Sequence, residues 1–227
     1  MDKRLIRLGI AAAAMLFASQ AGATVNFFNG LEGGSGDVEN VLLDGGVDGG
    51  DPGTFGPGLI VKGSTNQSDL LVDFQSTTNI VIVSVGQARI EPSLAAAFED
   101  ISIMLEDPTL GFTKIQFNID SDADVGVVIS ADWINTVTLL TGTTNSVGLT
   151  LDDTGQNFFT AIASDDQVMT KITITTDDPH MAKLQQVRLF AVERSGTPVT
   201  MVPEPATVLL LGAGLLGAGM VRRRRRM

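Results

Sequence analysis

Short runs of alternating polar and apolar residues recur along the middle of this chain and limit it to one fold class. Two clear examples are Lys114–Ile119 and Lys171–Thr175, in which Ile and Phe alternate with polar residues. This period of two places the apolar side chains on one face of a strand. Turn-forming residues follow such runs, as in Glu106-Asp107-Pro108. The pattern predicts an all-β fold, a single antiparallel β-sandwich that is jelly-roll-like or immunoglobulin-like.

Twelve segments rich in Val, Ile, Thr and Phe are expected to be strands. They are Val25–Phe28, Leu59–Val61, Leu70–Gln75, Ile80–Gln87, Phe98–Leu105, Lys114–Ile119, Val125–Ser130, Thr136–Leu140, Val147–Leu151, Phe158–Ala163, Thr170–Thr175 and Val187–Val192. One competing element lies at Pro92 to Asp100, where Ser-Leu-Ala-Ala-Ala-Phe-Glu-Asp is compatible with a turn of helix. The pattern does not determine the order of strands in the sheet.

The N-terminus has the three parts of a secretory signal peptide. Lys3, Arg4 and Arg7 are basic, Leu8 to Ala18 is apolar, and Ala21-Gly22-Ala23 matches an A-x-A cleavage site. We therefore expect residues 1–23 to be removed, with Ala21 and Ala23 specifying the cut. The chain has no cysteine, which excludes disulfides and a lipid-modified cysteine.

The C-terminus combines a short polar motif, an apolar run and a basic cluster. The motif is Pro203-Glu204-Pro205, and the sixteen residues from Ala206 to Val221 form the apolar run. At ~1.5 Å per residue this run spans ~24 Å as a helix, which suffices for a thinned bilayer with snorkelling arginines. The basic cluster favours the cytoplasmic side; it consists of Arg222, Arg223, Arg224, Arg225 and Arg226. A permanent membrane anchor is the simpler alternative.

These three parts together resemble the PEP-CTERM sorting signal of Gram-negative bacteria. The resemblance is confined to residues 203–227 and the signal peptide. It implies export through the secretory translocon with signal peptidase, an inner-membrane intermediate facing the periplasm, and processing near Pro203-Glu204-Pro205 by an exosortase. It also implies a final place on the cell surface or in the extracellular, exopolysaccharide-containing matrix of a biofilm.

The remaining residues, 24–202, form one acidic ectodomain. This region holds 24 acidic and 7 basic residues, so its net charge is −17. Such a charge disfavours nucleic acid and anionic lipid as partners and is compatible with divalent cations or with basic or neutral polymers. Within it, Gly30–Gly58 contains eleven glycines and six acidic residues, a composition that predicts a long surface loop rather than a strand.

The strongest metal-ligating pattern is Asp120, Asp122 and Asp124, three alternate aspartates at the end of an expected strand. Carboxylate oxygens are the ligands that Ca²⁺ prefers, so a loop calcium site is one interpretation. The pattern is not an EF-hand, because Val125 and Ala131 stand where that loop needs glycine and glutamate. A solvated turn is the alternative, and similar pairs such as Asp152-Asp153 favour it.

Catalytic patterns are weak. The chain has one histidine, His180, in a turn-like segment, and one tryptophan, Trp133, which we expect to be a partly buried packing residue. Paired carboxylates also suit glycoside hydrolysis, but the sequence does not determine their separation. We therefore expect a non-enzymatic surface or matrix protein without a cofactor, structural or adhesive in role. A Ca²⁺-dependent binding module is the first alternative, and a matrix polysaccharide hydrolase is the second.

Overall fold

The computed structural model describes residues 25–33, 38–43, 57–83, 89–94 and 97–194. This part of the chain contains thirteen strands and no helix, so the all-β prediction is confirmed. The strands are β1 (Val25–Asn29), β2 (Glu39–Leu42), β3 (Gly58–Thr65), β4 (Leu71–Val83), β5 (Arg89–Pro92), β6 (Asp100–Leu105), β7 (Leu110–Ser121), β8 (Val125–Asn135), β9 (Thr141–Asn145), β10 (Leu149–Leu151), β11 (Asn157–Ala163), β12 (Gln167–Thr176) and β13 (Met181–Glu193).

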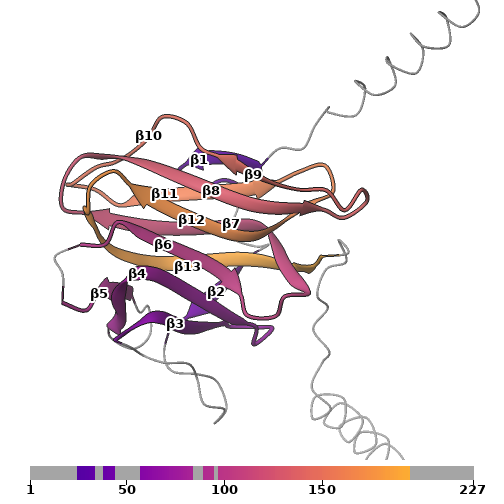
Figure 1. The fold of residues 1–227 in the computed structure, drawn as a ribbon, viewed down its shortest axis with the longest axis horizontal. Coiled ribbons are helices and arrows are strands. Elements are labelled where there is room, and N and C mark those ends of the chain that lie inside the picture. Colours follow the sequence, from indigo (N-terminus) through magenta and orange to yellow (C-terminus); the bar gives the residue numbers. More distant parts are fainter. Residues whose placement is uncertain (1–24, 34–37, 44–56, 84–88, 95–96, 195–227) are drawn as a thin grey trace, which may run out of the picture.

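The strands form one antiparallel sheet that closes on itself. Its hydrogen-bonded order is β1-β11-β7-β13-β2-β3-β4-β6-β12-β8-β10, with β9 beside β8. Strand β5 pairs with both β13 and β4, and β7 also pairs with β12 at Phe112 and Met169. Seven of the described strands, from β7 through β13 to β12, therefore make a closed circuit. The result is a barrel-like sandwich (Figure 1).

The core follows the alternation in the sequence. On β7, Ile115, Phe117 and Ile119 are fully buried, as the period of two predicts. The polar residues Gln116 and Asn118 between them, expected to face solvent, are buried as well. The ring of Phe117 lies 5.9 Å from that of Phe159 on β11, tilted by 39°. Each such side chain contributes roughly 2 kcal/mol by leaving water.

A glycine permits the circuit to close. A Cβ on Gly111 would lie 2.4 Å from Val168 Cγ1 and 2.5 Å from the carbonyl oxygen of Met169. Atoms cannot approach this closely, so any side chain would push β7 away from β12 at the point where the two strands meet. Gly111 therefore allows the two sides of the sandwich to join.

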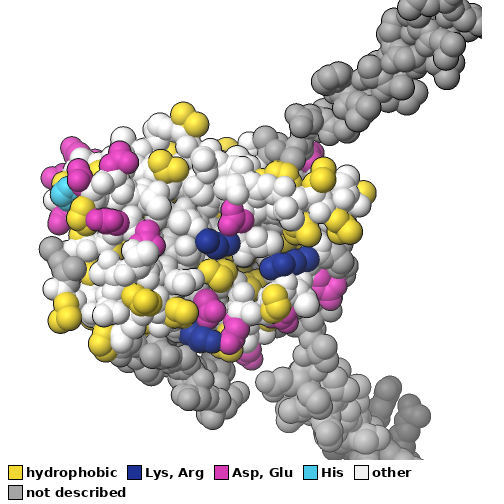
Figure 2. Space-filling model, in the orientation of Figure 1, with side chains coloured by type: hydrophobic (Ala, Val, Ile, Leu, Met, Phe, Trp, Pro, Cys, Tyr) yellow, Lys and Arg dark blue, Asp and Glu magenta, His cyan; other side chains and the backbone are white. Residues whose placement is uncertain are grey.

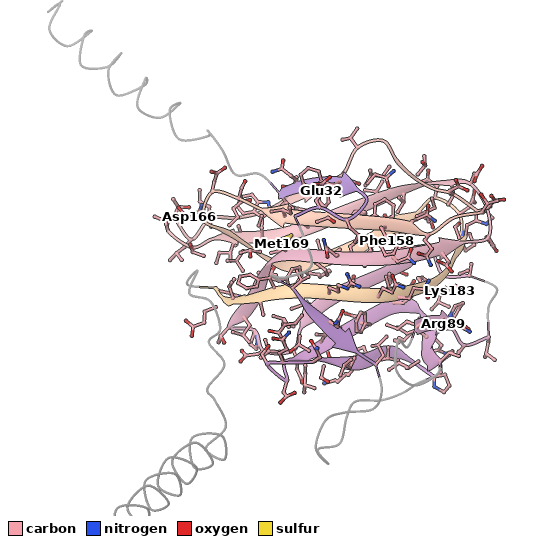
Figure 3. All side chains as sticks on the ribbon, turned by 180° about the vertical axis from the view of Figure 1, so that it is seen from behind. Glu32, Arg89, Phe158, Asp166, Met169 and Lys183 are labelled. Carbon is pink, nitrogen blue, oxygen red and sulfur yellow. The ribbon has the colours of Figure 1, made fainter. Side chains whose placement is uncertain are left out.

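Residues 30–33 lie on the outer face of β11 and β7. The side chains of Gln116 and Lys114 donate hydrogen bonds to the carbonyl oxygens of Glu32 (2.9 Å) and Gly33 (2.8 Å). Thr160 Oγ1 donates to Gly30 O at 2.8 Å. Figure 3 shows Glu32 and Phe158 on this side of the molecule. This part of the glycine-rich stretch is thus held to the sheet by polar side chains.

The structure corrects several predicted elements. Gly30–Gly58 is not one loop, because β2 lies within it. Leu70–Gln75 and Ile80–Gln87 were expected as two strands, but Leu71–Val83 is a single strand. Strand β5 was not predicted. In the segment from Pro92 to Asp100, Phe98 forms a bridge with Met181, and the described residues there contain no helix.

The segment Thr136–Leu140, expected to be a strand, is instead the turn between β8 and β9. The side-chain carbonyl of Asn135 accepts hydrogen bonds from the backbone N–H groups of Val137 (3.1 Å) and Thr138 (2.8 Å). An asparagine that bonds the backbone two and three residues ahead favours a turn over a strand ladder. This local competition overrode the apolar pattern.

The first described strand begins, and the last described strand ends, at the same end of the domain. Val25, which begins β1, pairs with Ala163 at the end of β11, and Glu193 at the end of β13 pairs with Leu110 at the start of β7. We call this the exit end. Within the described residues, no helix is long and apolar enough to span a membrane. The predicted signal peptide (1–23) and apolar run (206–221) lie outside these residues.

Candidate functional site

The end of the sandwich opposite the exit end gathers three acidic turns, and we call it the acidic end. They are the turn from β7 to β8 (residues 121–124), the turn from β10 to β11 (152–156) and the turn from β12 to β13 (177–180). Pairings such as Met181 with Ser121 and Leu151 with Val125 place them together. In Figure 2 acidic side chains surround the single histidine at the left of the molecule.

The three alternate aspartates of the sequence prediction do not share one site. Asp120 forms an ion pair with Lys183 at 2.8 Å and accepts a hydrogen bond from Gln185 at 3.1 Å, and both partners lie on β13. Asp122 lies 2.8 Å from His180 Nδ1. Asp124 accepts a hydrogen bond from the backbone N–H of Asp153 at 3.0 Å. Each carboxylate of the predicted calcium site thus has a different protein partner.

A different group of carboxylates comes together at this end. One oxygen from each of Asp124, Asp152 and Asp153 lies within 4.8 Å of the others, and all three side chains are exposed. An open hollow of about 330 Å³ lies beside them. It is lined by Asp124, Val125, Gly126, Thr150, Leu151 and Asp152.

Local hydrogen bonds shape this carboxylate group. The backbone N–H and Oγ1 of Thr154 donate to Asp152 Oδ1 at 2.9 and 2.8 Å, and they hold the pKa of Asp152 below its ordinary value. Hydrogen bonds to a carboxylate favour its charged form. Oxygen donors at this spacing suit a hard cation, but acidic turns have the same donors, so the calcium assignment stays a prediction.

Sequence reasoning interpreted Asp152-Asp153 as turn chemistry and did not join the pair to Asp124. The join depends on the short pairing of β10 with β8, in which Thr150 lies opposite Gly126. The sequence predicts strands at both places, Val125–Ser130 and Val147–Leu151, but it does not determine which strands pair.

His180 and its neighbours form a polar turn. Ser121 Oγ donates to the carbonyl oxygens of Ala123 (2.7 Å) and His180 (3.0 Å), not to the imidazole ring. A nucleophilic serine would instead donate to the ring nitrogen of its base. In this arrangement the hydroxyl fastens the β7–β8 turn to the β12–β13 turn.

Trp133 is a half-buried packing residue against the core, as expected. Its indole N–H donates to Thr144 Oγ1 at 3.0 Å, and its ring covers Gly142 on the neighbouring strand β9. A Cβ on Gly142 would lie 2.5 Å from Trp133 Cζ2. The ring is therefore occupied by packing within the sheet.

Comparison with protein families identifies the tail. Residues 202–226 match the family described as the PEP-CTERM protein-sorting motif. The chain carries a PEP-CTERM sorting signal. Its match includes Pro203, Glu204 and Pro205 and the arginine cluster, all outside the described residues. The motif implies export, a membrane-anchored intermediate and sorting by an exosortase, so the predicted resemblance is confirmed.

Comparison with curated proteins found no match. Among solved structures, the chain is similar to the CBM22-1–GH10 modules of Clostridium thermocellum endo-1,4-β-D-xylanase 10B complexed with xylohexaose, at 11% identity and a TM-score of 0.35, over 53% of this chain and 25% of that one. It is also similar to a family 29 carbohydrate-binding module, at 11% identity and a TM-score of 0.31, over 81% and 97%. At these TM-scores the likeness carries no argument about ligands.

Proposed function

We propose that this chain is a non-enzymatic surface or extracellular-matrix protein with a structural or adhesive role in an exopolysaccharide-containing biofilm. The sorting motif at residues 202–226 carries the proposal. Its partners are the secretory translocon, signal peptidase at Ala21 and Ala23, and an exosortase-type enzyme at Pro203-Glu204-Pro205. The membrane is a partner until the tail is removed.

The ectodomain suits this role in two respects. Its net charge of −17 keeps copies soluble and apart at high surface density and disfavours nucleic acid. The start of β1 and the end of β13 both lie at the exit end. Cleavage by signal peptidase or by the exosortase-type enzyme therefore leaves the sandwich whole, and its acidic end faces away from the tether.

Cell fractionation of a Pro203→Ala/Pro205→Ala double variant tests the sorting step. The unaltered protein should lose its tail and reach the outer surface or medium. The double variant should accumulate in the inner membrane at full length, because the processing enzyme no longer recognises its site. Pro198→Ala is the matched control, since it alters a proline four residues before the motif begins.

Equal retention of the unaltered protein and the double variant in the inner membrane would contradict the proposal and indicate a permanent anchor. Release of both to the same extent would show that processing does not use the Pro-Glu-Pro segment. In either case the matrix role would lose its support, because the motif is the observation that carries it.

A further inference from the structure

The turn between β8 and β9 exposes three apolar side chains. Val137, Leu139 and Leu140 are 71, 70 and 62% exposed. We call these three residues the apolar tip. In Figure 2 hydrophobic side chains gather at the right of the molecule, where β8 ends in Figure 1. Neighbouring exposed apolar residues on a loop are costly in water and commonly mark a contact surface.

The tip is held in place by a built turn. Asn135 accepts hydrogen bonds from Val137 N, Thr138 N and Thr138 Oγ1, at 2.8 to 3.1 Å. Its side-chain amide also donates to Asp165 O at 3.0 Å. Asparagine therefore ties the tip to the neighbouring β11–β12 turn. These hydrogen bonds fix the backbone of the turn, so its apolar side chains keep a defined orientation.

Leu139 adopts a φ of 59°, in the left-handed region. A branched, bulky side chain is strained there, and glycine or asparagine is the usual residue. Leu139 N nevertheless donates to Asn135 O at 2.8 Å, so the turn keeps this conformation. An exposed leucine in a strained position gains nothing from internal packing, which points to a function outside the domain.

The tip lies at the exit end. Asn135 pairs with Gln167 at the start of β12, and Met169 two residues later pairs with Phe112 near the start of β7. The same edge holds Leu110 paired with Glu193 at the end of β13. In Figure 3 Asp166, beside the tip, and Lys183, at the start of β13, lie at opposite ends of the molecule.

The chain length between this end and the sorting tail is short. Eleven residues, 195–205, separate Arg194 from the apolar run that starts at Ala206. Fully extended, they reach roughly 40 Å at most. In the membrane-anchored intermediate, the exit end is therefore tethered close to the bilayer surface, and the apolar tip shares that end.

We propose that the apolar tip inserts into the lipid interface of the membrane while the protein is anchored by its tail; this rests on the sorting role proposed above. Asp165 and Asp166 flank the tip, so the favoured surface is zwitterionic rather than anionic. Three side chains bind a bilayer weakly on their own. The tether makes the contact intramolecular, at a high effective concentration, and cleavage of the tail ends it.

The absence of cysteine from the chain makes a direct test possible. Full-length Val137→Cys, labelled with an environment-sensitive fluorophore, is reconstituted into phosphatidylcholine vesicles with brominated acyl chains. We expect lipid quenching at least threefold above that of a label at Leu94→Cys. Leu94 is the matched control, being a leucine 95% exposed beyond β5 on a different part of the surface.

Equal quenching at the two positions in protein that co-floats with vesicles would overturn the membrane contact and leave the anchoring intact. Failure to co-float would overturn both the contact and the anchored intermediate of the sorting role. A fluorescence change that occurs without lipid and grows with protein concentration would identify a second copy as the occupant, and would also overturn the proposal.

A second variant separates function from folding. Leu139→Gly removes an apolar side chain and relieves the left-handed strain, since glycine adopts positive φ readily. We expect a melting temperature equal to or above that of the unaltered protein, together with at least a twofold loss of lipid quenching at position 137. A lowered melting temperature with unchanged quenching would show that Leu139 only supports the turn.

Discussion

The two ends of the sandwich contain turns built in the same way from different residues. At the acidic end, Asp152 accepts hydrogen bonds from Thr154 two residues ahead, and the side chains on show are carboxylates. At the exit end, Asn135 accepts hydrogen bonds from Val137 and Thr138, and the exposed side chains of this turn are mainly apolar. An Asx-type turn thus fixes the backbone at either end. The residues placed on each turn decide whether that turn exposes charged or apolar side chains.

The ends also differ in how tightly the strands meet. At the exit end β7 and β12 touch through Gly111, whereas Gly126 at the acidic end has no atom within 4 Å of the place a Cβ would take. We expect Gly111→Ala to lower the free energy of unfolding by about 3 kcal/mol, because the added methyl meets backbone that cannot move aside. Urea denaturation measures the loss.

Gly126→Ala is the matched control and should change the free energy of unfolding by less than about 0.5 kcal/mol. If the two substitutions cost the same, the difference in packing between the ends would be refuted.

Gly142→Ala should have the next largest effect, a loss of about 2 kcal/mol. The new methyl displaces the ring of Trp133, and a side chain yields more easily than backbone. Trp133 is the only tryptophan, so its emission should shift to longer wavelength as the ring becomes wetter. Destabilisation with an unchanged emission maximum would place the strain elsewhere.

Acid titration compares the two ends through one aspartate each. Hydrogen bonds from Thr109 lower the pKa of Asp107 at the exit end, as those from Thr154 lower that of Asp152. A lowered folded-state pKa contributes stability that is present above the unfolded pKa and is lost as the pH falls through the folded one. Asp107→Ala and Asp152→Ala should each flatten the fall in melting temperature on acidification.

Burial raises the pKa of Asp73, a shift opposite to those of Asp107 and Asp152. Asp73→Asn should therefore not flatten the fall in melting temperature. A steeper acid transition in Asp152→Ala would contradict the role given to Thr154.

The smallest expected effect is on charge repulsion at the acidic end. With a chelator present and at low ionic strength, Asp153→Asn should raise the melting temperature by about 1–2 °C, because it removes one of three like charges within 4.8 Å. The gain should shrink as salt is added. Asp178→Asn, in a neighbouring acidic turn, is the control. A loss of stability would mean that the third carboxylate has a stabilising partner.

Most strands could be predicted from the sequence because one face of each is buried. On β12, Ile172 and Ile174 are fully buried and alternate with polar residues that face outward, so the period was readable. Strands β2 and β5 have four residues each; β2 lies in a glycine-rich stretch and β5 ends in Pro92. Their pairing comes from long-range neighbours, which local composition does not reveal.

The candidate site residues show the same limit: local turns can be predicted from the sequence, but contacts between strands cannot. The turn chemistry of Asp152 was visible in the sequence, but its meeting with Asp124 needed the β8–β10 pairing. The apolar tip lies in Thr136–Leu140, whose composition predicts a strand, but the hydrogen bonds accepted by Asn135 form a turn there instead. Partners such as Lys183 for Asp120, 63 positions apart, follow only from the sheet order.

The pairing of β1 with β11 and of β2 with β13 sets the order in which the exported chain folds. Val25 on β1 pairs with Ala163 on β11, and Glu39 on β2 pairs with Leu189 on β13, so each pairing forms only after its distant partner has been exported. During secretion from the N-terminus, these early strands have unpaired edges until nearly the whole domain has crossed. Pairings this distant in sequence form slowly. The last strand leaves the translocon just ahead of the tail, so the sandwich is completed on a chain that the tail still holds at the membrane.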